Sequence, residues 1–143
     1  MKTDPVITKN KFRLGIIFSL IFSILSIIID LNNEIYWQID ELVYQESPNW
    51  EWITAVILGT GLLVVLIGLL MFKYWARNIY VYMFFPCLLI YLLPSLSWTF
   101  YSGFAGIFYE LSIILSTLIW GILIVPSLYQ PLFEKRNSEI YEK

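Results

Sequence analysis

The sequence has no histidine and only one cysteine, Cys87. Without an imidazole, the protein has no general base, proton relay or metal ligand of the histidine type. A single thiol forms neither an internal disulfide nor a redox pair, which excludes oxidoreductases that work through paired cysteines. Charged residues make up 14% of the chain, well below the roughly 25% of soluble domains, so a soluble globular protein is disfavoured.

Apolar residues are abundant instead, at 59% of the 143 residues, and the mean hydropathy is +0.72. Four stretches approach or reach the roughly 20 apolar residues that a membrane-spanning helix needs. They cover about residues 14–31, 52–72, 79–98 and 109–128. We therefore predict an all-α integral membrane protein, with one membrane domain over residues 1–143 built as a four-helix bundle, a loop at 32–51 and a tail at 129–143.

The first predicted span is flanked by Arg13 and Asp30, which we expect to reach toward the two membrane interfaces. With Lys9 and Lys11 before it, this segment also has the basic start of a signal peptide. No small residues at a cleavage site follow, because the segment ends IIIDLN. An uncleaved anchor is therefore the favoured interpretation.

Basic residues are unevenly distributed along the chain. All nine precede the first span, separate the second from the third, or follow the fourth. These segments carry a net charge of +5, whereas the other two loops, with the span ends beside them, contain no basic residue and carry −7. Loops rich in Lys and Arg stay in the cytoplasm. We therefore predict a multi-pass protein of the bacterial inner membrane with both termini cytoplasmic, and Lys73, Trp75 and Arg77 as its topology anchors.

Small residues form stripes on three of the predicted spans. Lipid tails are as apolar as leucine, so membrane helices associate through close packing at small residues and through hydrogen bonds between helices. The predicted helix-packing positions are Gly15, Ser19, Ser23, Gly61, Gly68, Ser112 and Ser116. A polar pathway lined by these hydroxyls is the alternative, and it is less favoured because serines alone make a poor ion path.

The predicted third span is irregular because it contains Pro86 and Pro94. Each proline leaves one backbone carbonyl without its helical donor, which favours a kink or an early helix end. Broken spans line binding sites in transporters, although prolines are also common in membrane helices. The candidate cavity residues are Tyr82, Pro86, Cys87 and Tyr91.

The loop at 32–51 is the longest segment between predicted spans. Its apolar residues recur at helical spacing from residue 34 to residue 45, which predicts a short amphipathic helix on the outer membrane face. The acidic side of that helix has two interpretations, a solvated face or a docking surface for a basic partner segment. The docking residues would be Glu34, Trp37, Asp40 and Glu41.

Motifs for catalysis or cofactor binding are missing from the sequence. It has no phosphate loop, no metal-ligand spacing and no nucleophile elbow. Charged residues are absent from the middle of the predicted spans, where proton-coupled transporters carry carboxylates. We therefore expect no enzyme activity, no cofactor, no metal and no nucleic-acid partner.

The hairpin between the second and third spans reads KYWARNIY, and the fourth span ends with VPS. In these features the chain resembles a widespread, poorly characterised group of small bacterial inner-membrane proteins with four spans, a basic N-terminus and a Trp-Ala-Arg hairpin. The matching residues are Trp75, Ala76, Arg77, Pro126, Ser127 and Phe133. The long acidic first loop and Pro86 depart from that pattern. The resemblance implies the topology and the location, but no activity and no functional residue.

Two functional hypotheses are compatible with these features. The favoured one is a non-enzymatic protein in the lipid bilayer that contacts another membrane protein or a second copy of itself; one form of it is immunity to a membrane-targeting toxin. The alternative is a small-molecule or lipid transporter that works as an oligomer through the proline-broken third span. A purely structural membrane component is a third class, which the sequence does not separate from the first.

Overall fold

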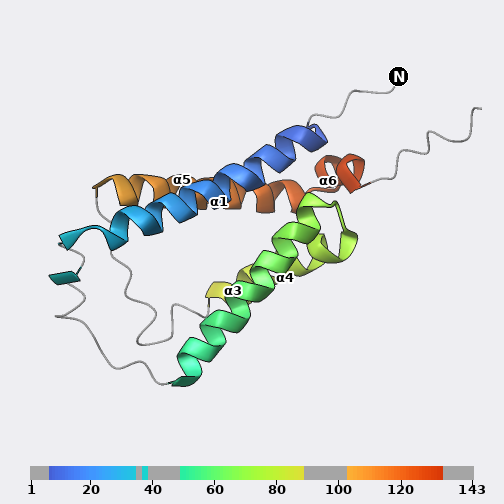
Figure 1. Ribbon diagram of the computed structural model, residues 1–143. Helices are drawn as coiled ribbons and strands as arrows, with labels where there is room; N and C mark the ends of the chain where they lie inside the picture. The colour runs from blue at the N-terminus through green and yellow to red at the C-terminus, as the bar shows by residue number, and fades with distance from the viewer. Residues whose placement is uncertain (1–6, 35–36, 39–48, 89–102, 134–143) are drawn as a thin grey trace, which may run out of the picture.

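In the computed structural model, residues 7–34, 37–38, 49–88 and 103–133 are described (Figure 1). This part of the chain is helical and contains no strand, which confirms the predicted all-α class for it. Its helices are α1 (Lys9–Leu31), α3 (Asn49–Leu70), α4 (Tyr74–Leu88), α5 (Gly103–Ile124) and α6 (Pro126–Phe133).

Three of these helices, α1, α3 and α5, are long and apolar enough to cross a membrane. They contain 22 or 23 residues each. At 1.5 Å per residue that is about 33 Å, which matches a hydrocarbon core of about 30 Å. Three of the four predicted spans, the first, second and fourth, therefore correspond to helices of suitable length and composition. Helix α4 covers the first part of the predicted third span, and residues 89–98 of that span lie outside the described residues.

The helix limits differ from the limits of the apolar stretches. Helix α1 begins at Lys9, before the apolar run, because the Thr8 hydroxyl caps it by accepting from the Lys11 amide at 3.4 Å. Helix α5 begins at Gly103 rather than at about residue 109. It ends before Val125, since a residue that precedes proline disfavours the helical region, and Pro126 then starts α6. Hydropathy marks the part of a helix within the membrane, not the turns beyond it.

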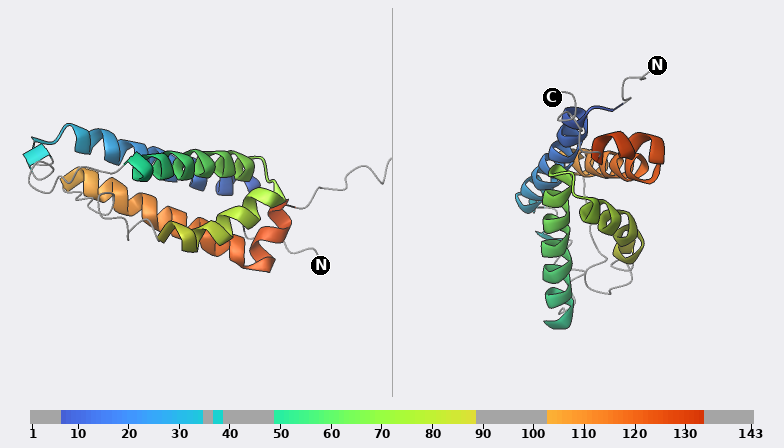
Figure 2. Two further views of the ribbon diagram at one scale, coloured as in Figure 1. Left: turned by 90° about the horizontal axis from the view of Figure 1, so that it is seen from below. Right: turned by 90° about the vertical axis from the view of Figure 1, so that its right-hand side faces the viewer.

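The helices form two pairs that meet at one end of the molecule. Figure 1 shows α1 and α5 side by side along their length, and α3 and α4 in a second pair that leads away from them. The right-hand view of Figure 2 shows the same separation, with α3 and α4 leading away from α1 and α5. The five described basic residues all lie at the end where the pairs meet, which we call the basic end: Lys9, Lys11, Arg13, Lys73 and Arg77.

The buried core is concentrated at the basic end. It draws on all five helices and consists of Phe12, Ile16, Val65, Leu69, Ala76, Ile119, Leu123, Leu132 and Phe133. Further along the spans few side chains are covered, and only 11% of the most apolar window of α5 is buried within the chain. Most of the apolar surface of the spans is therefore left for lipid or for another protein.

Candidate functional site

Serine residues join α1 to α5. The hydroxyl oxygens of Ser19 and Ser116 are 2.9 Å apart. Ser19 also donates to the Ser112 carbonyl at 3.3 Å, and the Ser112 hydroxyl donates back to the Ser19 carbonyl at 3.1 Å. A hydroxyl has one hydrogen, so Ser116 is the donor when Ser19 bonds the carbonyl. Ser26 extends the contact by donating to the Ala105 carbonyl at 2.9 Å.

A small cavity of about 120 Å³ lies beside this serine contact. Four helices line it, with Ile16, Ser19, Leu20, Ser23, Leu62, Leu66, Tyr80, Ser112, Ser116 and Ile119. A water molecule occupies about 30 Å³ in the liquid, so the cavity has room for a few waters. It is well below the roughly 300 Å³ of the smallest typical ligand pockets. All four serines predicted as helix-packing positions line this cavity: Ser19, Ser23, Ser112 and Ser116.

Arginine side chains at the basic end bond to the ends of neighbouring helices. Arg13 Nε donates to the carbonyl of Leu70, the last residue of α3, at 3.1 Å. Arg77 donates to the Leu123 carbonyl near the end of α5, from Nε at 3.0 Å and from Nη2 at 2.8 Å. Carbonyls in the last turn of a helix lack an intrahelical donor and carry a partial negative charge. Each arginine therefore caps a helix other than its own.

The turn between α3 and α4 is built around Phe72, which has a positive φ of 55°. The amide of Lys73 donates to the Gly68 carbonyl and that of Phe72 to the Leu69 carbonyl, both at 2.9 Å, the bond pattern of a Schellman motif. This position usually holds glycine, because a side chain there costs about 1–2 kcal/mol. The Phe72 ring contacts those of Phe12 and Phe133 at centroid distances of 6.1 and 5.9 Å, which offsets the cost and ties the turn to α1 and α6.

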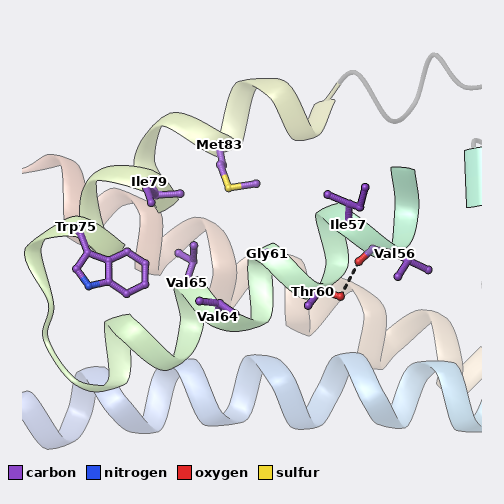
Figure 3. Close-up of a pocket in the computed structure, with 9 residues that line it drawn as sticks. All are labelled: Val56, Ile57, Thr60, Gly61, Val64, Val65, Trp75, Ile79 and Met83. Atoms are coloured by element: carbon purple, nitrogen blue, oxygen red, sulfur yellow. Dashed lines mark hydrogen bonds between the residues drawn. The ribbon is translucent and has the colours of Figure 1, made fainter. Parts of the chain in front are cut away.

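An open groove of about 540 Å³ lies between α3 and α4 (Figure 3). Its lining residues are Val56, Ile57, Thr60, Gly61, Val64, Val65, Trp75, Ile79 and Met83. The Thr60 hydroxyl donates to the Val56 carbonyl at 2.7 Å, so it is satisfied within α3. The groove surface is therefore almost entirely apolar, and Trp75 stands at the end nearest the α3–α4 turn (Figure 3).

The two glycines predicted to pack α3 have different environments. A Cβ atom at Gly68 would lie 2.6 Å from Cβ of Ala76 and 2.9 Å from the Trp75 ring, so α3 and α4 are in close contact there. A Cβ atom at Gly61 would have nothing within 4 Å, because this residue lines the groove. On α1, a Cβ at Gly15 would just reach Ile119 of α5, at 4.0 Å.

The candidate cavity residues of the third span lie on the surface of α4 where they are described. Tyr82 is 74% exposed and Pro86 is exposed, and the helix continues past Pro86 to Leu88. With Asn78, Ile79 and Met83, they line an open hollow of about 270 Å³. Every described lining residue comes from α4 itself, so this hollow is a surface depression. The Cys87 side chain and Tyr91 lie outside the described residues.

The acidic loop is described only at its start. Glu34 is exposed, and Trp37 is 51% exposed with its indole donating to the Leu31 carbonyl at 3.1 Å. Asp40 and Glu41, and most of the predicted amphipathic helix, lie outside the described residues.

Two carboxylates at the end opposite the basic end are buried. Asp30 is 6% exposed and Glu51 is 1% exposed, and each has one carboxylate oxygen without a hydrogen-bond partner. Asp30 continues the helix face of Ser19 and Ser26 that packs on α5, so its carboxylate is covered by protein, and its reach toward the membrane interface stays a prediction. Within the described ranges, no group of three or more Cys, Asp and Glu side chains is arranged to hold a metal ion.

Sequence reasoning missed Phe72 and the capping role of the two arginines. The arginine caps have only a weak signal in the sequence, and the Phe72 turn has none. A cation near a helix end is a known capping pattern, but here the cation lies on a different helix from the one it caps. A phenylalanine at a left-handed position has no sequence signal, since glycine or asparagine is expected there.

Comparisons with family models, with curated proteins and with solved structures found no match for this chain.

Proposed function

We propose that this chain is a non-enzymatic, four-span protein of the bacterial inner membrane, with both termini in the cytoplasm, that acts by packing its helices against another membrane protein. The observation that carries the proposal is a second small-residue face on α5. Ser112 and Ser116 bond to α1. Thr117 and Gly121 are also four residues apart, so they share one face of α5. Each residue turns the helix by about 100°, which places this face about 140° from the face of Ser112 and Ser116, on the other side of the helix.

This second face of α5 is open. Thr117 is exposed, and a Cβ atom at Gly121 would have nothing within 4 Å. Beside them, Ile114 and Leu118 are 53% and 57% exposed. Two small residues at an interval of four allow the backbones of two membrane helices to approach closely, whereas contact with lipid gains nothing from them. A transmembrane helix of a partner is therefore the occupant that this face fits best.

The test is crosslinking of the full chain in its native membrane. A photoreactive residue in place of Leu118 is expected to give an adduct with a second membrane protein, and the same residue in place of Val56, on the exposed surface of α3, is the position control. Gly121→Leu should reduce the α5 adduct at least tenfold. Gly59→Leu is the matched control, because it too adds bulk where nothing lies within 4 Å.

The outcomes separate the proposal from its competitors. No adduct at Leu118, or equal adducts at Leu118 and Val56, would contradict a specific helix contact. An adduct of twice the chain mass would identify the partner as a second copy of this chain. It would contradict the proposal that the partner is a different membrane protein.

One form of the proposal is immunity to a membrane-targeting toxin, with the acidic loop or the helix surface as the contact. It is tested by expressing the chain beside its cognate toxin. Removal of residues 34–46 should abolish protection if Glu34 and Trp37 belong to the contact surface. Gly121→Leu should abolish it if the α5 face does. Protection that survives both changes would refute the immunity hypothesis in either version.

A further inference from the structure

We propose that the groove between α3 and α4 binds one acyl chain of an anionic phospholipid, whose phosphate is held by Lys73 and the first turn of α4. This inference is independent of the proposed protein contact, which uses a different helix face, and of the direction in which the chain crosses the membrane. It requires only that the basic end lies at a membrane surface.

The shape of the groove suits a chain rather than a helix. At the basic end α3 and α4 are in contact, since the space beside Gly68 is filled by Ala76 and Trp75. Away from that contact the open groove lies between the helices, lined by Ile79 and Met83 of α4 and by Gly61 of α3 (Figure 3). A helix is about 10 Å across with its side chains, so it is too wide to enter the closed end of the groove beside Gly68. An acyl chain can enter it, and the apolar lining leaves no polar group for it to bury.

Lys73 is an exposed cation in the turn at the closed end of the groove, where its amide donates to the carbonyl of Gly68, the residue that contacts Trp75 and Ala76. Three other described cations at the basic end are engaged: Lys9 and Arg13 lie over the Phe72 ring, and Arg77 bonds to Leu123. Lys73 is exposed, and its ammonium makes no ion pair or hydrogen bond with any described residue. It lies two residues before Trp75, which lines the groove.

The first turn of α4 adds to the attraction for an anion. The Lys73 carbonyl accepts from the Arg77 amide at 3.2 Å, so Lys73 occupies the capping position of the helix. A lysine side chain has no acceptor, so it does not satisfy the amides of Trp75 and Ala76, the second and third residues of α4, as a serine or aspartate cap would. No described side chain accepts from these N–H groups, and together with the positive end of the helix dipole they favour a phosphate oxygen.

The order of these groups along α4 matches the order of groups in a phospholipid. Lys73 comes first, then the Trp75 ring, then Ile79 and Met83. A headgroup phosphate, an interfacial glycerol region and an acyl tail follow in the same order from a membrane surface inward, and tryptophan favours the interfacial depth. From Trp75 to Met83 the helix rises about 12 Å, which is enough for a large part of one chain. Basic sites between membrane helices are established positions for anionic headgroups.

Native mass spectrometry of the full chain released from nanodiscs tests the proposal. The discs hold equal parts of phosphatidylglycerol and phosphatidylcholine, and the measured quantity is the ratio of the two lipids retained by the protein. The wild-type chain should retain one lipid, mainly phosphatidylglycerol. Lys73→Gln should lower the preference for phosphatidylglycerol about fivefold, the effect of one cation near an anionic surface. Gly61→Leu should displace both lipids, because its side chain fills the groove.

Two matched controls distinguish the site from general effects. Lys11→Gln removes another exposed cation from the basic end, and Gly59→Leu adds the same bulk to α3 at a position outside the groove with nothing within 4 Å. Both should leave the retained lipid unchanged. The proposal is overturned if the wild type retains no lipid, if Lys73→Gln has no effect or the same effect as Lys11→Gln, or if the retained mass is phosphate alone or a second copy of the chain.

Discussion

Arg77 combines two roles at the level of a single residue. As a cation in a short turn, it contributes to the charge asymmetry that orients a membrane protein. As a planar group, it donates two hydrogen bonds to the Leu123 carbonyl and lies 4.0 Å from the centre of the Tyr129 ring. The first role needs only charge, whereas the second needs the guanidinium shape. A substitution that keeps the charge therefore separates them.

Arg77→Lys should destabilise the folded chain by about 1–2 kcal/mol, because an ammonium does not reproduce the paired bond or the stacking on Tyr129. The measurement is the free energy of unfolding in detergent. Lys73→Arg is the control, since Lys73 is exposed and caps no other helix. Reporter fusions should show the same topology for both variants. A stability equal to that of the wild type in Arg77→Lys would contradict the capping role.

The hydroxyl pair of Ser19 and Ser116 offers a second test at the residue scale. In a double-mutant cycle of Ser19→Ala and Ser116→Ala, the coupling energy should be about 0.6 kcal/mol, the average for such bonds inside membranes. A cycle of Ser19→Ala with Ser23→Ala is the matched control, because Ser23 lies at the same cavity without bonding Ser19. Equal coupling in the two cycles would show that the hydrogen bond itself contributes nothing.

At the scale of the helix, the pairing of α3 with α4 depends on one residue without a side chain. Gly68→Ala should destabilise the chain by about 1–3 kcal/mol, because the added methyl group would lie 2.6 Å from Cβ of Ala76 and the helices must move apart. Gly61→Ala, where the added atom meets nothing within 4 Å, should not destabilise. Thermal unfolding of both variants in the same detergent decides this, and a Gly68→Ala chain as stable as Gly61→Ala would contradict the close contact.

Helix positions were largely predictable from the sequence, and helix partners were not. The membrane requires long apolar runs, and these runs identify α1, α3 and α5 in one pass along the chain. Small-residue stripes occur on each of them, so nothing in the stripes alone says that Ser19 meets Ser116 while Gly61 lines a groove. Turn geometry is also hidden, because the left-handed conformation of Phe72 is imposed by its ring contacts rather than by its own preference.

At the scale of the whole molecule, charge is sorted between the two ends. The described basic residues share one end, whereas Asp30, Glu34 and Glu51 lie at or near the other. Loops rich in basic residues stay in the cytoplasm. Reporter fusions should therefore place positions 40 and 100 outside the cell, and positions 75 and 140 inside. An inverted result at any of these positions would refute the orientation.

The partnership of α1 with α5 has a consequence for how the chain is made. Ser19 and Ser116 are 97 positions apart in the sequence, with α3 and α4 between them. At roughly 5–20 residues per second, a ribosome takes about 5–20 s to synthesise that interval. During this time α1 has left the ribosome and has no native partner for the hydroxyls of Ser19 and Ser26. Helix α1 must therefore wait for α5, which is made after α3 and α4, and a factor that covers its polar face in the meantime would be part of the biogenesis of this protein.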